Sequence, residues 1–299
     1  MRAPIACCVL VLLGLTAASI EAGQIHVPGD YVVLQDAIDA ALPGDVILID
    51  GGSHPPVVID TPVYLVGYAS NRPLLRPYLA GEAPPGGQQP PVHLSGPGLE
   101  GVTLSGIDIG GATDGGWFFD NVPAITGGGF DELRLLHCDV RAPGWDGATG
   151  TEPVARPALD VDVSYLLVED STVVGGVAVT DFFWADPDVP GGGAGIRCTG
   201  DVAVFDSTVR GGPGLDVTFD DGLFAPDGCD GVTGGRGGPG IVTSGKLYRG
   251  RSTIQGGPGA DIDLEHQNNH KQIIDQIHVE VADPGLMVLG RIVGVGEFP

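Results

Sequence analysis

The stretch Val202-Ala-Val204-Phe-Asp-Ser-Thr-Val209-Arg-Gly-Gly212 sets the frame for the fold: two apolar residues two apart, a third seven after the first, then glycines. Related stretches begin at Val102, Leu133, Leu166 and Leu247, the last without the second apolar residue. The three most C-terminal members share a serine–threonine pair before the final apolar residue. Units recurring every 31 to 45 residues are typical of a solenoid whose coils carry insertions of variable length.

Residues 1–22 have the pattern of a secretory signal peptide. One arginine precedes a short apolar run, and small residues lead to a cleavage site after Ala22. The run is too short for a membrane span, and no other segment is long and apolar enough. We therefore expect an exported protein, extracellular, periplasmic or attached to the cell surface. A lipoprotein modified at Cys7 or Cys8 is the alternative.

The charge of the chain excludes several partners. The net charge is −24, and 38 acidic residues, mostly aspartate, stand against 14 basic ones. Such a field repels nucleic acid and anionic membranes, and it disfavours anionic polysaccharides unless a cation bridges them. Glycine and proline are abundant while the apolar fraction stays at 42%, so frequent turns between short strands are expected rather than disorder.

The layout of the chain predicts one domain over 23–299. Apolar residues at helical spacing in Tyr31–Leu42 predict a short amphipathic helix that ends at Pro43-Gly44. Strands follow at 45–49, 57–59 and 63–66. We divide the rest into a cap and first coil at 24–70, a proline-rich loop at 70–91, repeated coils at 92–260 and C-terminal strands at 261–299.

The motif Leu34-x-x-Ala37-Ile38-x-x-Ala41-x-x-Gly44-Asp45-x-Ile47-x-Ile49-x-x-Gly52 resembles the cap and first coil of the pectin-lyase-like superfamily. The resemblance implies an all-β, right-handed parallel β-helix whose short N-terminal helix plugs the end of the core. That superfamily contains polysaccharide lyases, glycoside hydrolases, adhesins and non-enzymatic surface proteins, so the resemblance indicates a fold and leaves the activity open. Its usual internal asparagine ladder is absent, because the chain has only four asparagines.

The repeats also sort side chains between the core and the surface. The fifth position after the first apolar residue is small or apolar in every repeat and is expected to form an inward stack. Strand alternation then turns the fourth and sixth positions outward. Asp170, Asp206 and Arg251 are expected to form a charge ladder there. The outward groups available for acid–base chemistry are Asp108, Asp139, Asp170, Asp206 and His137.

The insertions between repeats are the first candidate binding region. Each begins after the third apolar residue of a repeat, so all are expected to leave from one edge of the stack. They contain all three tryptophans, each close to aspartate: Trp117 with Asp120, Trp145, and Trp184 with Asp186. Aromatic faces stack on sugar rings while carboxylates accept hydroxyl hydrogen bonds, which favours polysaccharide or cell-surface glycan as partner. The alternative is that these aromatics fold back onto the stack.

The insertion after Val209 is the candidate metal site. Five carboxylates lie among glycine turns, and calcium prefers such oxygen-rich loops, although the spacing is not that of an EF-hand. The residues are Asp216, Asp220, Asp221, Asp227 and Asp230. A histidine pair, His266 and His270, is a weaker candidate. No cofactor other than calcium is expected. Cys138 and Cys198 are expected to be small core residues; a Cys198–Cys229 disulfide is the alternative for the second.

Catalytic signatures are incomplete. Arg72-Pro-Leu-Leu-Arg76 has only a distant likeness to a lyase arginine motif, and Asp220-Asp221 lacks the other elements of a polygalacturonase site. The three Gly-Gly-Pro-Gly runs at 211–214, 237–240 and 256–259 are predicted to be turns. The sequence therefore favours a non-catalytic surface or extracellular protein. A calcium-dependent polysaccharide lyase or a glycoside hydrolase with a non-standard site is the alternative, and a structural spacer or adhesin is the second.

Overall fold

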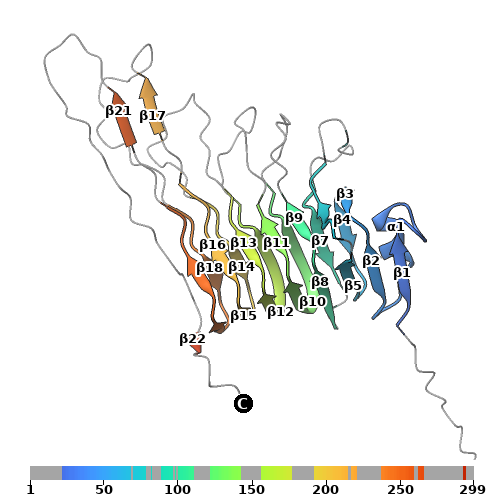
Figure 1. The fold of residues 1–299 in the computed structure, drawn as a ribbon. Coiled ribbons are helices and arrows are strands. Elements are labelled where there is room, and N and C mark those ends of the chain that lie inside the picture. Colours follow the sequence, from blue (N-terminus) through green and yellow to red (C-terminus); the bar gives the residue numbers. More distant parts are fainter. Residues whose placement is uncertain are drawn as a thin grey trace, which may run out of the picture.

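The computed structural model describes residues 22–68, 70–78, 82, 89–96, 98, 100–110, 122–142, 156–176, 192–214, 217–220, 237–258, 262–265 and 292–293. In these residues the chain is predominantly β, with one short helix. The strands pair in parallel with equivalent strands of neighbouring repeats, so their hydrogen bonds run along the stack (Figure 1). The arrangement is compatible with a parallel β-helix.

The first stack of strands supplies one wall of the core. Its register places apolar residues of successive repeats over one another, as in Leu65, Leu104, Leu135, Val168 and Val204. The strands, in spatial order, are β1 (Gln24–Val27), β2 (Val46–Ile49), β5 (Tyr64–Gly67), β8 (Gly101–Ser105), β10 (Ile125–Leu136), β12 (Leu159–Glu169), β15 (Asp201–Phe205), β19 (Leu247–Gly250) and β22 (Ile292–Val293).

The second stack is a seven-stranded sheet. The third apolar residue of each repeat lies in it, and Ile109, Val140, Val173 and Val209 are all buried in register. The strands are β3 (Gly52–His54), β6 (Pro73–Leu75), β9 (Asp108–Gly110), β11 (Asp139–Arg141), β13 (Thr172–Val174), β16 (Thr208–Arg210) and β20 (Thr253–Gln255). The predicted loop at 70–91 therefore contains a strand, β6, which pairs with β3 and β9.

A third wall is formed by short strands that pair with one another or with the first halves of β10 and β12. These strands are β4 (Val57–Ile59), β7 (Val92–Ser95), β14 (Ile196–Cys198) and β18 (Ile241–Thr243). Among them, β7 pairs with β4 and β10, and β14 pairs with β12 and β18. A separate parallel pair joins β17 (Val217–Asp220) and β21 (Ile262–Glu265). The short strands β14 and β18 precede β15 and β19, so each of these two repeats contains three strands.

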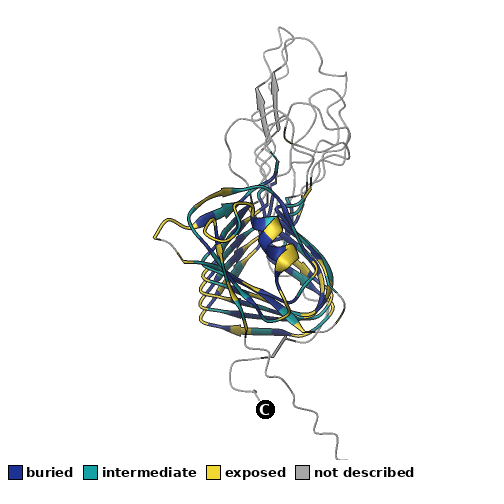
Figure 2. Ribbon diagram, turned by 90° about the vertical axis from the view of Figure 1, so that its right-hand side faces the viewer, coloured by how far each residue is buried: buried dark blue, intermediate teal, exposed yellow. Residues whose placement is uncertain are grey.

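The helix α1 (Leu34–Ala40) lies across one end of the core (Figure 2). Leu34, Ala37 and Ile38 are buried, whereas Val32 and Leu42 are 82% and 59% exposed. The predicted helix over 31–42 is therefore too long at both ends. This seven-residue helix, the one found in the described part of the chain, is far too short to cross a membrane.

The Gly-Asp pair after the helix has a clear local role. Gly44 has a φ of 89°, which favours glycine. The carboxylate of Asp45 is buried and accepts the amide N–H groups of Gly23, at 2.6 Å, and Leu42, at 2.9 Å. Asp45 thereby ties the end of the helix to the segment before β1, and the buried charge is satisfied by two donors.

Candidate functional site

A sharp corner joins the first stack to the seven-stranded sheet in each repeated coil. One residue at each corner adopts the left-handed conformation, with φ between 46° and 66°. These residues are Gly106, His137, Asp170, Asp206 and Arg251. They are the fourth position of the repeat, which was expected to face outward through strand alternation. The side chains do face outward, but the cause is different, because each residue is a corner between two strands rather than part of one.

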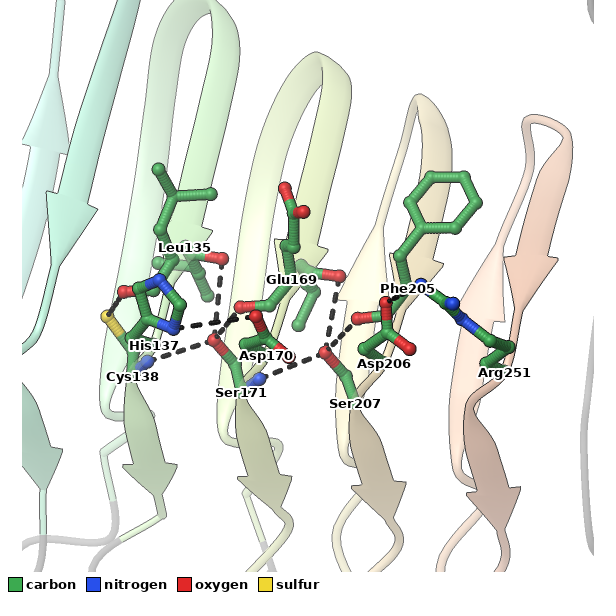
Figure 3. A network of polar contacts seen from close by, with 12 residues as sticks. Leu135, His137, Cys138, Glu169, Asp170, Ser171, Phe205, Asp206, Ser207 and Arg251 are labelled. Atoms are coloured by element: carbon green, nitrogen blue, oxygen red, sulfur yellow. Dashed lines mark hydrogen bonds and ion pairs between the residues drawn. The ribbon is translucent and has the colours of Figure 1, made fainter.

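The outer side of the corner carries one ion pair and one contact between a histidine and a carboxylate (Figure 3). Arg251 donates to the Asp206 carboxylate at 2.6 Å, and His137 Nδ1 lies 3.6 Å from Asp170 Oδ2. The expected ladder of Asp170, Asp206 and Arg251 therefore forms only in part, since Asp170 turns to the histidine. The four side chains are between 32% and 84% exposed. Water and salt therefore screen both contacts, and their contribution to stability is small.

The inner side of the corner carries a ladder of serines, and we call it the serine ladder: Ser171, Ser207 and Ser252. The hydroxyl of Ser171 accepts the amide N–H of Cys138 at 2.9 Å. Ser207 accepts that of Ser171 at 3.0 Å, and Ser252 that of Ser207 at 3.2 Å. Each hydroxyl donates in turn to the carbonyl two residues earlier, at 2.6–2.8 Å. Figure 3 shows these contacts for Ser171 and Ser207.

The prediction that the fifth position of the repeat faces inward is confirmed. The residues at this position in the five repeats are all 6% exposed or less: Ile107, Cys138, Ser171, Ser207 and Ser252. The serine ladder also explains how this chain satisfies its corners without asparagine. A buried amide N–H without a partner is costly, and a serine hydroxyl can accept and donate at the same time. The serine–threonine pair of the repeat is thus an inward serine followed by an outward threonine.

Two of the predicted acid–base candidates are neighbours on the outer face of the seven-stranded sheet. Asp108 of β9 and Asp139 of β11 are paired in register. Arg141 holds Asp139 in two contacts, at 2.9 and 3.0 Å, and Arg72 Nε lies 3.1 Å from Asp108 Oδ1. Partial burial raises the pKa of the Asp108 carboxyl despite Arg72, and the charge of Asp139 raises it further. Asp108 is therefore readier to hold a proton than a carboxyl group in water.

Arg72 is the residue whose structural role the sequence did not reveal. Besides Asp108, its guanidinium contacts the backbone carbonyl of His137 and that of Ile107, the latter at 3.5 Å. It therefore clamps two successive corners from outside. Nothing in the repeat frame marks this contact, because Arg72 precedes the first repeat by 30 positions and reaches the corner only through the stacking of β6 on β9.

The strands of the seven-stranded sheet end at one common edge, the loop edge. Gly110, Arg141, Val174, Arg210 and Gln255 are aligned in register at these ends. The insertions follow them, as expected. The tryptophans and aspartates of the proposed glycan surface lie in those insertions and outside the described residues: Trp117, Asp120, Trp145, Trp184 and Asp186.

The chain leaves and re-enters the loop edge through glycine pairs that we call the glycine stems: 175–176, 192–193, 211–212, 237–238 and 256–257. Along the stack, a stem in which the chain leaves the loop edge lies next to one in which it returns. Backbone N–H···O=C hydrogen bonds of 2.7–2.8 Å join successive stems through Gly176, Gly193, Gly212, Gly238 and Gly257. A Cβ atom on Gly212 would lie 1.8 Å from the Gly176 carbonyl oxygen. The prediction that 211–214 and 237–240 are turns is therefore wrong: their glycines permit close packing of extended segments. The third run, 256–259, has the same geometry as far as it is described.

The predicted metal residues cannot be placed in the same way. Asp216, Asp221, Asp227 and Asp230 lie outside the described residues, as do His266 and His270, and Asp220 is described only as the last residue of β17. Among the side chains that the structure describes, no three His, Cys, Asp or Glu residues gather closely enough to bind a metal ion.

The two described cysteines are core residues, as predicted. Cys138 and Cys198 are 2% and 3% exposed, and burial raises the pKa of each thiol to about 11. Both are free, so Cys198 is not in the disulfide considered as an alternative. A thiol held neutral by burial is a poor nucleophile, which argues against catalysis by either cysteine.

A shallow depression on the third wall was also missed by sequence reasoning. It is lined by Gly127–Gly129 of β10, Asp160 and Asp162 of β12, and Thr199 after β14. The available signal was the run of three glycines next to the alternating Asp-Val-Asp of the following repeat. We call this depression the glycine hollow.

Neither the protein-family models nor the curated proteins contain a match to this chain.

Proposed function

We propose that this chain is an exported, right-handed parallel β-helix of the pectin-lyase-like type that binds glycan without cleaving it, at the surface of the cell or outside it. The fold is supported by the parallel register of the stacks and by a helix across one end of the core. The glycan-binding role rests on one observation above all, the alignment of the strand ends at the loop edge.

The alignment matters because it brings distant insertions together. Strands in one sheet lie about 4.8 Å apart, so consecutive insertions start within one strand spacing of one another. Trp117, Trp145 and Trp184 follow β9, β11 and β13 in that order. We expect the three rings to provide a platform on which the sugars of an extended chain stack. The glycine stems hold the bases of the later insertions in fixed positions.

The test is binding of the purified protein to a panel of neutral glycans and polyuronates, with and without calcium, followed by analysis for new reducing ends and unsaturated products. We expect binding without turnover. Replacing Trp117 and Trp184 by Ala is expected to abolish it, whereas Tyr64→Ala, which removes an exposed aromatic ring from another wall, is expected to leave it unchanged. Turnover would refute the non-catalytic role, and absence of any binding would leave a spacer or adhesin.

A second candidate function is polysaccharide cleavage, and one observation favours it. Asp108 and Asp139 are adjacent carboxylates in register, and the raised pKa of Asp108 suits a proton donor. In this alternative Asp108 serves as acid and Asp139 as base, with Asp170, Asp206 and His137 further along the face. Asp108→Asn and Asp139→Asn would each abolish the turnover while leaving Trp-dependent binding intact.

The insertion after β16 is the region in which we expect calcium to bind. Asp216, Asp220, Asp221, Asp227 and Asp230 are expected to bind one calcium ion and to order that insertion. Thermal unfolding with calcium and with a chelator tests this directly. A rise in the unfolding temperature with calcium, lost in Asp221→Asn together with Asp227→Asn, is the expected result, and equal unfolding temperatures in both conditions would contradict it.

A further inference from the structure

The glycine hollow exists because three consecutive residues of β10 have no side chains. Thr126 pairs with Asp160 and Gly128 with Asp162, so Gly128 lies directly beside Asp162. The register then shifts between Gly128 and Phe130, which marks a bulge. A Cβ atom on Gly128 would lie 2.4 Å from the Asp162 carbonyl oxygen, and Gly127 and Gly129 have φ of 100° and 81°. Backbone geometry therefore requires glycine at all three positions.

Polar side chains of β12 and β14 surround this bare stretch of backbone. Leu159 and Val161 are buried, so Asp160 and Asp162 alternate outward on the same face. Thr199 donates to Asp162 Oδ1 at 2.5 Å, and Arg197 lies 3.4 Å from Asp160 Oδ2. Each carboxylate has one such partner among the described residues, and a carboxylate has capacity for several further donors.

The hollow fits a polyhydroxylated, uncharged ligand. Asp160 and Asp162 accept hydrogen bonds from hydroxyl groups, and Arg197 donates. The Thr199 hydroxyl, whose proton goes to Asp162, can accept one from a sugar hydroxyl. An anionic sugar would meet two carboxylates on a chain whose net charge is −24. A bound metal ion would need more ligands than this face offers, since no third acidic or histidine side chain joins the two aspartates in the described residues.

The position of the hollow links it to the loop edge. The chain returns from the insertion after β11 at Arg156 and enters β12 at Leu159, so Asp160 follows the loop edge by four residues. Four extended residues cover about 13 Å, which is the length of a few sugar units. A glycan chain of a few units bound at the loop edge can therefore reach the hollow.

We propose that the glycine hollow is a second subsite for a neutral glycan chain, in which Asp160, Asp162 and Thr199 hydrogen-bond the hydroxyls of a sugar unit seated over Gly127–Gly129. This inference rests on the proposed glycan-binding function. It specifies the ligand as a neutral glycan rather than a polyuronate. It also specifies the path of that glycan, which runs from the loop edge across β12.

The experiment measures binding of hexasaccharides of glucan, xylan, mannan and polygalacturonate by titration calorimetry. The test variants are Asp160→Asn with Asp162→Asn, which keep the side-chain shape, and separately Thr199→Val. The control is Glu132→Gln, which changes a carboxylate that is also paired with an arginine, Arg134, at 2.7 Å on another wall. Loss of hydrogen bonds to charged groups is expected to weaken binding of a neutral hexasaccharide by about tenfold or more in the double variant. Circular dichroism of each variant checks that it folds.

The outcomes separate this inference from the function on which it rests. Loss of affinity in the hollow variants, with the control unchanged, supports the subsite. Unchanged affinity in those variants together with loss in Trp117→Ala and Trp184→Ala overturns the subsite and leaves the loop-edge function standing. Binding that depends on the hollow but not on the tryptophans would keep the subsite and refute the loop-edge site. Failure of the wild type to bind any of the neutral probes, or preference for polygalacturonate, overturns the subsite.

Discussion

The N-terminal and C-terminal halves of the stack solve the same corner in different ways. In the C-terminal half, serines inside the corner accept amide N–H groups from the neighbouring repeat. In the N-terminal half, Ile107 occupies the equivalent inward position, and Arg72 clamps the corner carbonyls from outside. Cys138 lies between the two halves; its amide donates to Ser171, but its thiol is only a weak hydrogen-bonding group. One backbone corner can thus be stabilised by interior hydroxyls or by a surface guanidinium.

The glycine stems belong to the C-terminal half alone among the described repeats, and breaking them is expected to have the largest effect. In Gly212→Ala the new Cβ meets a backbone oxygen that cannot move without shifting the neighbouring stem. We expect a loss of about 3 kcal/mol or more in the free energy of unfolding. Urea denaturation measures it. Gly44→Ala is the control, because nothing lies within 4 Å of its Cβ and only the left-handed backbone is strained, at about 1–2 kcal/mol.

Ser207→Ala breaks the serine ladder in the middle. The amide N–H of Ser171 then loses its buried acceptor, and we expect the free energy of unfolding to fall by about 1–3 kcal/mol. Thr208→Ala, the outward neighbour in the same repeat, is the matched control and should change stability by less than half as much. Equal losses in the two variants, measured in the same denaturation series, would show that the ladder does not contribute beyond packing.

Arg72→Gln tests the clamp of the N-terminal half. The guanidinium is partly exposed, so solvent screening limits its ion pair with Asp108, and we expect a loss of about 1 kcal/mol in the free energy of unfolding. Arg141→Gln removes an arginine that holds only its own strand neighbour, Asp139, and is expected to cost less. If both variants unfold at the same urea concentration, the contacts of Arg72 with the corner carbonyls have no separate effect.

Cys138→Ser extends the serine ladder by one repeat into the N-terminal half. The hydroxyl is a better acceptor and donor than the thiol but is less apolar, so we expect a change within about 1 kcal/mol in the free energy of unfolding. Cys198→Ser, at a buried position outside the ladder, is expected to destabilise more, since its contact with the Val163 carbonyl is long, 3.9 Å, and the ladder's amide donors are absent there. The reverse order would mean that the corner cannot accommodate another hydroxyl.

The smallest expected effect is a pH dependence in the N-terminal half. Burial lowers the pKa of His54 below its ordinary value of 6.5, so the folded state prefers the neutral ring. The unfolded chain therefore binds the proton more readily, and stability falls as the pH drops through 6.5 toward the folded pKa. His54→Gln is expected to reduce the loss of stability between pH 7.5 and 5. Parallel stability profiles of wild type and variant would exclude His54 as a contributor, and His93→Gln on the outer face of β7 serves as control.

Much of the scaffold was predictable because it depends on local patterns. The spacing of Val202, Val204 and Val209 predicts buried apolar positions that recur in each coil, but not the corner between Val204 and Val209. The motif around Gly44-Asp45 resembles a cap before the first coil. The serine ladder was only half predictable: Ser171, Ser207 and Ser252 were assigned inward, but their bonds to the next repeat depend on stacking. The Gly-Gly-Pro-Gly runs were misjudged because glycine and proline usually signal turns, whereas here glycine is needed where extended segments touch.

The sequence by itself determined which residues face the core and where the insertions begin, because strand alternation and the repeat frame are properties of a short segment. Tertiary structure alone decided which repeats' side chains meet: Arg72 with the corner at His137, Asp108 with Asp139, and Asp162 with Thr199. These pairs are separated by 31 to 65 positions in the chain. They form because parallel strands stack whole repeats in register, and the lengths of the insertions, which the repeat frame does not constrain, set how far apart the partners are in the sequence.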